Sequence, residues 1–175
     1  MSDCYFKKEL TEEGIELDFK LIDSRMHDLE KIIGFRFKDV RNLANAMCSI
    51  QVFRPGAGES SREYYNSTLA TVGDSVIKSI LADALFRKGL YMGEITQIKS
   101  SLESNDYFYK LSNDYGLYRY SFNRKYFYDE APGHEKLPNS KHNAFFEAIV
   151  GAVFYDSGYE KCREWLLSKF YSQLM

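Results

Sequence analysis

Two stretches of the chain combine an apolar helical pattern with a single acidic residue. Asp74 comes one helical turn after Ala70, and Glu147 comes one turn after Ala144. Because residues three or four apart lie on one face of a helix, each alanine stands where a second carboxylate would complete an acidic pair. Hard divalent cations prefer carboxylate oxygens, and Mg²⁺ often binds through only one or two of them. The pattern resembles a metal-dependent scaffold that keeps only half of its carboxylates, in which case Asp74 and Glu147 would be the remaining ligands.

Each of the two acids also has an ordinary structural explanation. An aspartate in the middle of a helix usually faces solvent or satisfies a buried donor, which would account for Asp74. Glu147 is harder to explain in this way, because its neighbours are apolar and an unpaired buried carboxylate is costly. It either pairs with a cation such as Lys78 or Lys141, or it faces the metal position. We favour the second explanation.

The elements that must position these acids are predicted to be helices. Apolar residues recur at helical spacing over residues 23–34, 39–47, 63–88, 93–103, 106–114, 140–156 and 159–174. Residues 49–61 and 118–139 are predicted to be loop and irregular segments, and no segment shows strong strand alternation. The fold class that follows is all-α.

Several residues mark where these helices begin, end or pack. The predicted N-caps are Asp23 or Ser24, Asp39, Asn105 and Ser140, and the predicted helix ends are Gly34 and Gly89. Gly73 lies in the middle of the longest predicted helix, where glycine costs about 1 kcal/mol relative to alanine. We therefore expect another element to pack closely against Gly73.

The composition fits one soluble globular domain of 175 residues with 45% hydrophobic residues and a net charge of −2. We expect residues 1–22 to form an N-terminal extension and residues 23–175 to form the domain. No apolar run approaches membrane-spanning length, and the N-terminus lacks a hydrophobic signal segment. Three isolated cysteines predict reduced thiols in a cytoplasmic protein.

Four motifs follow one another along the chain: LEKIIGFRFKD at 29–39, NSTLATVGDS at 66–75, MGEITQIK at 92–99 and NAFFEAIVGAVFYDSG at 143–158. In this order and spacing they resemble the endonuclease domain of the ribonuclease III family. The resemblance covers most of residues 26–170. One motif alone would be weak, but four in sequence are specific.

The resemblance implies a helical domain that forms a homodimer and lays double-stranded RNA across a shared valley. Magnesium ions there would activate water to cleave one phosphodiester bond on each strand. The family supplies four carboxylates from two facing helices. One helix carries a glutamate followed four residues later by an aspartate, and the other carries an aspartate followed three residues later by a glutamate.

This chain departs from that pattern at both helices. Asp74 and Glu147 match one acid of each pair, whereas Ala70 and Ala144 stand at the other two positions. We therefore expect Mg²⁺ or Mn²⁺ to bind weakly, if it binds, and cleavage to be absent or slow. Thr71 replaces an aromatic residue that in many members helps to join the two subunits. The chain is expected to contain no double-stranded-RNA-binding domain.

Four further residues are candidates for roles around the site. Glu94, in the third motif, is predicted to be an outer-shell helper of a metal ion. Arg124 and Lys125 lie in a segment, residues 118–128, that mixes cations with aromatic rings and so suits looped RNA. Lys141 is a third candidate RNA-binding cation. For residues 118–128 we favour a structural alternative, in which the aromatic rings are folded under a loop and the basic residues form a solvated rim.

Three functions are compatible with these residues. The first is a ribonuclease III-like protein that binds or processes double-stranded or structured RNA with a degraded site, as a homodimer or paired with an intact paralogue. The second is an active metal-dependent endoribonuclease that uses Asp74 and Glu147. The third is a structural dimerisation module of a ribonucleoprotein, which the near-neutral charge permits because dedicated nucleic-acid binders usually carry a basic excess.

Overall fold

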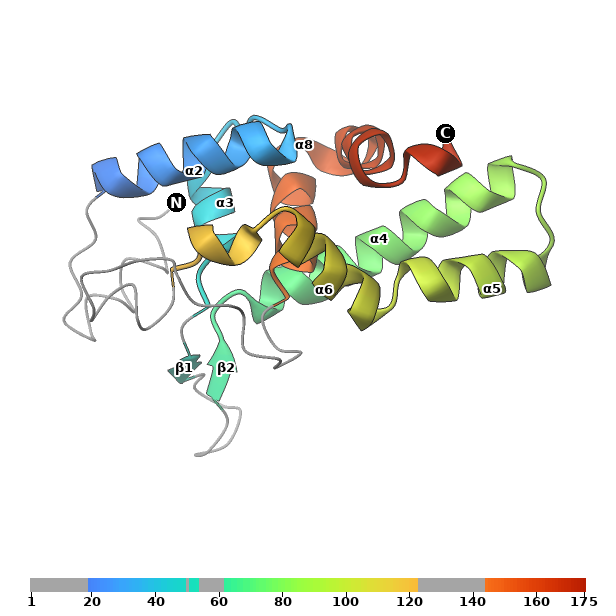
Figure 1. Ribbon diagram of the computed structural model, residues 1–175, viewed down its shortest axis with the longest axis horizontal. Helices are drawn as coiled ribbons and strands as arrows, with labels where there is room; N and C mark the ends of the chain where they lie inside the picture. The colour runs from blue at the N-terminus through green and yellow to red at the C-terminus, as the bar shows by residue number, and fades with distance from the viewer. Residues whose placement is uncertain (1–18, 50, 54–61, 123–143) are drawn as a thin grey trace.

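The computed structural model describes residues 19–49, 51–53, 62–122 and 144–175, which form a mostly helical domain (Figure 1). In chain order the elements are α2 (Phe19–Ile33), α3 (Val40–Ala46), β1 (Gln51–Phe53), β2 (Arg62–Tyr64), α4 (Ser67–Arg87), α5 (Met92–Leu102), α6 (Asn105–Asp114), η1 (Leu117–Tyr120), α8 (Phe145–Phe170) and η2 (Ser172–Leu174). The predicted all-α class is confirmed. Within these ranges no helix is both long and apolar enough to cross a bilayer.

The two longest helices, α4 and α8, touch backbone to backbone at the centre of the domain (Figure 1). A Cβ atom added to Gly73 would lie 1.7 Å from the carbonyl oxygen of Glu147. A Cβ atom added to Gly151 would lie 2.2 Å from the carbonyl oxygen of Leu69. Only glycine fits at either position, so the close packing predicted at Gly73 is confirmed and has a counterpart on the facing helix.

Helix α8 folds back on itself at Gly158, whose φ of +81° and ψ of 174° interrupt the helix. If the helix were straight, Phe146 and Phe170 would lie roughly 36 Å apart. Their ring centroids are instead 5.0 Å apart, in an edge-to-face arrangement. Phe108 of α6 packs on Phe146 at 5.6 Å, so these rings join both halves of α8 to α6 in one core.

Helices α2 and α3 are held to the second half of the chain by polar contacts. The indole N–H of Trp165 donates to the carbonyl oxygen of Ile33 at 2.9 Å, at the end of α2. The carboxylate of Asp156 accepts from the backbone N–H groups of Lys38 and Asp39, at 3.1 and 3.0 Å. Asp156 thereby binds the chain just before α3, where the first amides of a helix need acceptors.

The start of α3 and the ends of two helices agree with the sequence. Asp39 is the N-cap of α3, and its side chain accepts from the backbone N–H of Arg41. Gly34 and Gly89, with φ of +67° and +79°, follow α2 and α4 as predicted. Positive φ is accessible to glycine at little cost, which explains why both helices end there.

Two other predicted helix starts are wrong. Helix α2 begins at Phe19 and runs through Asp23 and Ser24, so neither residue caps it. The apolar spacing simply continues upstream of Asp23, and residues 19–22 belong to the helix. The N-cap of α6 is Ser104, not Asn105, and the Ser104 hydroxyl accepts from the backbone N–H of Tyr107 at 3.2 Å. Serine and asparagine are about equally good caps, so the sequence could not choose between neighbours.

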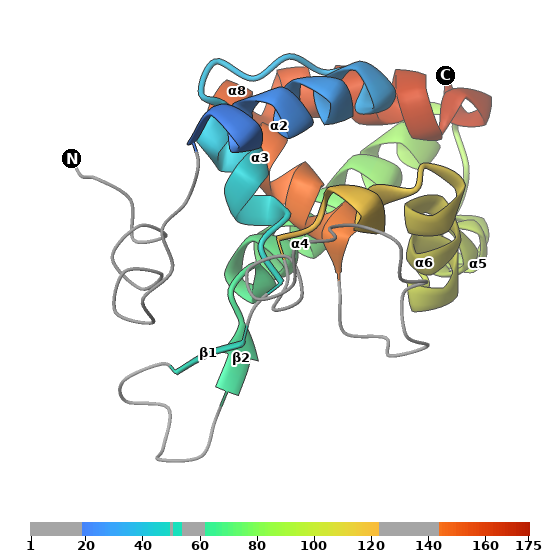
Figure 2. The same cartoon turned by 60° about the vertical axis from the view of Figure 1, so that its left-hand side comes forward.

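The predicted loop at 49–61 and the first residues of the predicted long helix contain a short hairpin instead. Strands β1 and β2 pair antiparallel, with Gln51 opposite Tyr64 and Phe53 opposite Arg62. Helix α4 therefore begins at Ser67, later than the predicted start at residue 63. Figure 2 shows the hairpin extending away from the helices. Three-residue strands are too short to display alternation, and their pairing is not a local property of the sequence.

The last two predicted helices, 140–156 and 159–174, are the two halves of α8. Its first helical residue is Phe145, and the predicted cap Ser140 lies outside the described residues. The second half ends at Phe170, and the last residues form the short 3₁₀ helix η2. The predicted break between the two segments coincides with Gly158.

The Gly73 contact makes a quantitative prediction. Gly73→Ala should lower the free energy of unfolding by about 3 kcal/mol, because the new methyl group would overlap a backbone carbonyl that cannot move alone. Gly93→Ala is the matched control, since a Cβ atom there meets nothing within 4 Å and the residue is helical. The control should be neutral or stabilising by up to about 1 kcal/mol. Equal effects in urea unfolding would contradict the packing argument.

Asp156 should make stability depend on acid pH. Burial raises the pKa of its carboxyl, but hydrogen bonds from Asp39, Lys38, Ser157 and Asn42 outweigh burial, and the net pKa is lowered. Its contribution is therefore present above the unfolded value of 3.8 and is lost as the pH falls through the lower folded pKa.

Asp156→Asn should cost about 1–2 kcal/mol at pH 7, because the amide cannot accept all these bonds and brings a donor. In chemical denaturation the difference from the unsubstituted chain should shrink below pH 4. Asp114→Asn is the control, because Asp114 forms an exposed ion pair with Lys110, and such pairs contribute little to stability. A similar loss for both variants would argue against the role of Asp156.

Candidate functional site

Asp74 and Glu147 project from the place where α4 and α8 touch. Asp74 follows Gly73 in the first half of α4, and Glu147 lies in the first turn of α8. The backbone of Glu147 is the surface on which Gly73 packs. The negative charge of Asp74 also contributes to the raised pKa of Glu147. The tertiary structure therefore brings the two acids predicted from the sequence into electrostatic contact.

Asp74 forms an ion pair within its own helix. The ammonium of Lys78 donates to Oδ2 of Asp74 at 2.7 Å, and the two side chains are 45% and 37% exposed. The pKa of Lys78 is raised mainly by this hydrogen bond, against an opposing effect of burial, and the charges of Asp74 and Glu103 add to the shift. Lys78 was one of the two cations considered for Glu147. In the structure its partner is Asp74.

Glu147 is in a very different environment from Asp74. The pKa of its carboxyl is raised to about 7. Burial is the main cause, a hydrogen bond from its own backbone N–H opposes the shift, and the charge of Asp74 adds to it. At neutral pH a large fraction of Glu147 is therefore protonated. Lys141, the other cation considered for it, lies outside the described residues.

The two alanines do not occupy equivalent places. Ala70 is a buried residue of α4, 8% exposed, one turn before Asp74. Ala144 is the N-cap of α8, with φ of −70° and ψ of 57°, so it precedes the regular helix that was predicted to contain it. Alanine makes no capping bond, whereas aspartate is among the best N-cap residues. An aspartate at residue 144 would therefore cap α8 and also supply a carboxylate to the site.

The structure adds a second ion pair that the sequence analysis missed. Lys99 and Glu103, at the end of α5, pair at 2.6 Å and are only 24% and 18% exposed. Glu103 acts on Lys78, so this pair lies near the first one. We call the five residues together the charged cluster: Asp74, Lys78, Lys99, Glu103 and Glu147. The spacing of four residues could have suggested the Lys99–Glu103 pair, but only the folding of α5 against α4 brings it to the site.

Tyr171 is a buried residue close enough to Glu147 and Glu103 for their charges to act on it. It is fully buried, and its hydroxyl donates to the carbonyl oxygen of Leu102 at 3.0 Å. Its pKa is raised mainly by burial, with further contributions from Tyr107, Glu147 and Glu103. Its ring stacks on that of Tyr107 at 5.8 Å. The C-terminal segment is therefore attached to the end of α5, next to Glu103.

The sequence pattern of the ribonuclease III domain matches residues 67–158, from the first residue of α4 to the break in α8. This match covers more than half of the chain. The chain belongs to the ribonuclease III family. The resemblance inferred from the four motifs is thereby confirmed.

Ribonuclease III relatives and solved structures agree with this assignment. A "Ribonuclease 3" from Caenorhabditis briggsae is 30% identical over 151 residues, which are 85% of this chain and 13% of that protein. One from Nitratiruptor is 28% identical over 142 residues, 80% of this chain and 58% of that protein. The chain thus spans less than two thirds of either relative. The nuclease domain of ribonuclease III from Campylobacter jejuni shares the fold, with a TM-score of 0.60 and 21% identity over 90% of this chain and 97% of that one.

The ribonuclease III family generally uses divalent metal ions, but the charged cluster does not fit a two-metal site. Two of the four expected carboxylates are alanine, Asp74 is paired with an ammonium group, and the pKa of the Glu147 carboxyl is raised to about 7. Among the residues that the structure describes, no three His, Cys, Asp or Glu side chains come together as a metal-binding group. We therefore assign no metal-dependent step to this chain.

Glu94 does not occupy the outer-shell position predicted for it. It lies in the first turn of α5, at the tip of the α4–α5 hairpin, where its Oε2 accepts from the backbone N–H of Tyr91 at 2.9 Å (Figure 1). About 20 Å of helix separates Asp74 from Arg87 at this end of α4. Glu94 is thus a capping residue of α5, remote from the acids of its own chain.

The three predicted RNA-binding cations cannot be placed. Arg124, Lys125 and Lys141 all fall in the range 123–143, outside the described residues. Their role stays a prediction. The cations that the structure does place beside the acids are Lys78 and Lys99, and neither was among the predicted RNA contacts.

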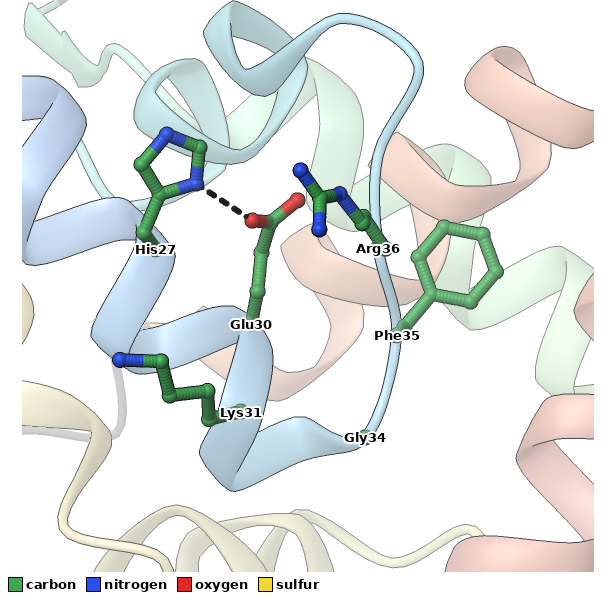
Figure 3. Close-up of a pocket in the computed structure, with 6 residues that line it drawn as sticks. All are labelled: His27, Glu30, Lys31, Gly34, Phe35 and Arg36. Atoms are coloured by element: carbon green, nitrogen blue, oxygen red, sulfur yellow. Dashed lines mark hydrogen bonds and ion pairs between the residues drawn. The ribbon is translucent and has the colours of Figure 1, made fainter.

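An open pocket of about 450 Å³ lies apart from the charged cluster, at the corner after α2. Its lining includes Glu30, a buried carboxylate that accepts from the backbone N–H of Phe37 at 2.6 Å and pairs with Nδ1 of His27 at 2.7 Å. Figure 3 shows His27 and Arg36 on either side of the Glu30 carboxylate, with Lys31 directed away. Glu30 fixes the turn from α2 into the next segment, so its role is structural.

The burial of Glu147 can be tested by unfolding at two pH values. Its folded pKa of about 7 lies above the unfolded value of 4.5, so its stabilising contribution is full below pH 4.5 and is lost as the pH rises through 7. Glu147→Gln, which mimics the protonated form, should raise the free energy of unfolding by about 2 kcal/mol at pH 8 and change it little at pH 4. Glu160→Gln, at an exposed position of α8, should show no such difference. Equal behaviour of the two variants would mean that Glu147 is solvated.

Proposed function

We propose that this chain is a ribonuclease III-fold protein that binds double-stranded or structured RNA in RNA processing and cleaves it slowly or not at all. The observation that carries the proposal is the state of the acids at the α4–α8 contact. Asp74 is paired with Lys78, the pKa of the Glu147 carboxyl is raised to about 7, and alanine stands at the other two positions. Stabilising the charge that develops on a scissile phosphate requires more positive charge than this arrangement could hold through a metal ion.

The family acts on double-stranded RNA, and this chain shares the helical fold of a ribonuclease III nuclease domain. Duplex RNA is recognised through its shape, its phosphates and its 2′-hydroxyls, and not mainly through sequence. Such recognition needs a helical scaffold and cations but no catalytic acids. The overall net charge of −2 means that phosphate contacts would have to come from local cations, such as Lys78 and Lys99 or the predicted Arg124, Lys125 and Lys141.

We also propose a homodimer, with a heterodimer containing an intact paralogue as the alternative. The solved Campylobacter jejuni nuclease domain of similar fold is described as having a region involved in dimer formation. In this chain Thr71 is exposed on α4, and its hydroxyl donates to the carbonyl oxygen of Ser67 at 2.9 Å. A contact through this face would lack the aromatic residue that many members place there, which favours a weaker dimer or a different partner.

The proposal predicts binding without cutting. A blunt RNA duplex of about 30 base pairs should bind with an affinity that falls at least about tenfold between 50 and 200 mM salt, because binding releases counterions from phosphates. The same duplex should stay intact in Mg²⁺ and in Mn²⁺ at enzyme concentrations above that of the RNA. Filter binding and denaturing gels measure the two properties separately.

Two outcomes would replace the proposal by an alternative. Cleavage that Glu147→Gln abolishes would show an active endoribonuclease that works with Asp74 and Glu147 alone. Failure to bind duplex RNA at low salt, together with a dimer in analytical ultracentrifugation, would favour a structural dimerisation module. A DNA duplex of the same length is the control for non-specific electrostatic binding, since it lacks the 2′-hydroxyls.

A further inference from the structure

Lys78 lies where it neutralises an acid that the family uses to hold a metal ion. It is one helical turn after Asp74 on α4, and its ammonium nitrogen is 2.7 Å from Oδ2 of Asp74. Both side chains are partly exposed at the α4–α8 contact, so the ammonium group faces the same side of the domain as the acid. An ammonium is a compact point charge with three donors on a flexible stem.

The surroundings of Lys78 make it more than an isolated surface pair. The charge of Glu103 also acts on Lys78, and Glu103 is itself paired with Lys99 at 2.6 Å. Two of the three carboxylates in the charged cluster, Asp74 and Glu103, are each paired with an ammonium group. These two acids therefore add no net negative charge that could attract a divalent cation.

We propose that the ammonium group of Lys78 takes the place of a metal ion in this chain, holding Asp74 with a positive charge that is attached to the protein. This inference rests on the same acid-poor site as the proposed function and adds the residue that compensates for the missing metal. A divalent ion approaching Asp74 would meet a like charge within hydrogen-bond distance of its ligand. The chain then differs from the family pattern in two ways. It has alanine in place of carboxylates at residues 70 and 144, and it has Lys78 beside the retained Asp74.

The proposal is tested by restoring the acids with and without Lys78. The double variant Ala70→Glu with Ala144→Asp is compared with the triple variant that also carries Lys78→Met, and Mn²⁺ alone is the probe in isothermal titration calorimetry. We expect the triple variant to bind Mn²⁺ at least about tenfold more tightly than the double variant, because one more unit of positive charge has left the site. Circular dichroism checks that each variant is folded.

Two controls separate the ammonium of Lys78 from general effects of charge or substitution. Lys110→Met in the acid-restored background removes an ion pair of the same spacing, Lys110–Asp114 at 2.6 Å, on another helix. It should leave Mn²⁺ affinity at the level of the double variant. Lys78→Arg keeps the positive charge and should also leave the Mn²⁺ affinity unchanged. Lys78→Gln should raise the affinity as Lys78→Met does, and it is used instead if the methionine variant does not fold.

Equal Mn²⁺ affinities for the double and triple variants would overturn the proposal, as would no Mn²⁺ binding by either. A gain with Lys110→Met as large as that with Lys78→Met would overturn it too. RNA plays no part in this measurement, so the result does not depend on the proposed function. Conversely, a chain that fails to bind duplex RNA could still show the expected dependence of Mn²⁺ binding on Lys78.

Discussion

The contact between the backbones of α4 and α8 determines how the rest of the domain is arranged. Gly73 packs on the carbonyl of Glu147, and Gly151 packs on the carbonyl of Leu69, at separations that leave no room for a side chain. Because the interior of a protein is close-packed, such a contact restricts how the two helices can be placed relative to each other. Asp74 and Glu147 emerge from this contact. Their proximity is therefore a consequence of backbone packing and does not require a metal ion to hold them together.

The same contact explains why the two acids have opposite properties. Asp74 emerges on the partly exposed side and is paired with Lys78, whereas Glu147 is pressed against the neighbouring helix and lies near the buried Tyr171. Burial disfavours the charged form of a carboxyl, which is why the pKa of Glu147 is raised to about 7. One helix crossing thus places a partly exposed acid in an ion pair and a second acid in a buried environment. A metal ligand has to be deprotonated, so the raised pKa of Glu147 disfavours metal binding near neutral pH.

The sequence predicted the helical class, most helix ends and the close approach at Gly73, because these depend on residues near one another in the chain. It failed where the deciding partner is distant. The β1–β2 hairpin joins residues on either side of a predicted loop, and Asp156 binds the start of α3 more than a hundred positions away. Glu94 was predicted to be an outer-shell helper of a metal ion. In the fold, α4 extends about 20 Å beyond Asp74, and Glu94 lies after it, in the first turn of α5.

The sequence by itself determined which carboxylates the site retains, since Asp74 and Glu147 remain and Ala70 and Ala144 cannot supply oxygen ligands in any conformation. It also determined the family, because four motifs in order leave few alternatives. Only the tertiary structure decided the surroundings of each retained acid, because burial depends on neighbours from other elements. Asp74 is partly exposed and pairs with Lys78 on its own helix, whereas burial raises the pKa of the Glu147 carboxyl to about 7.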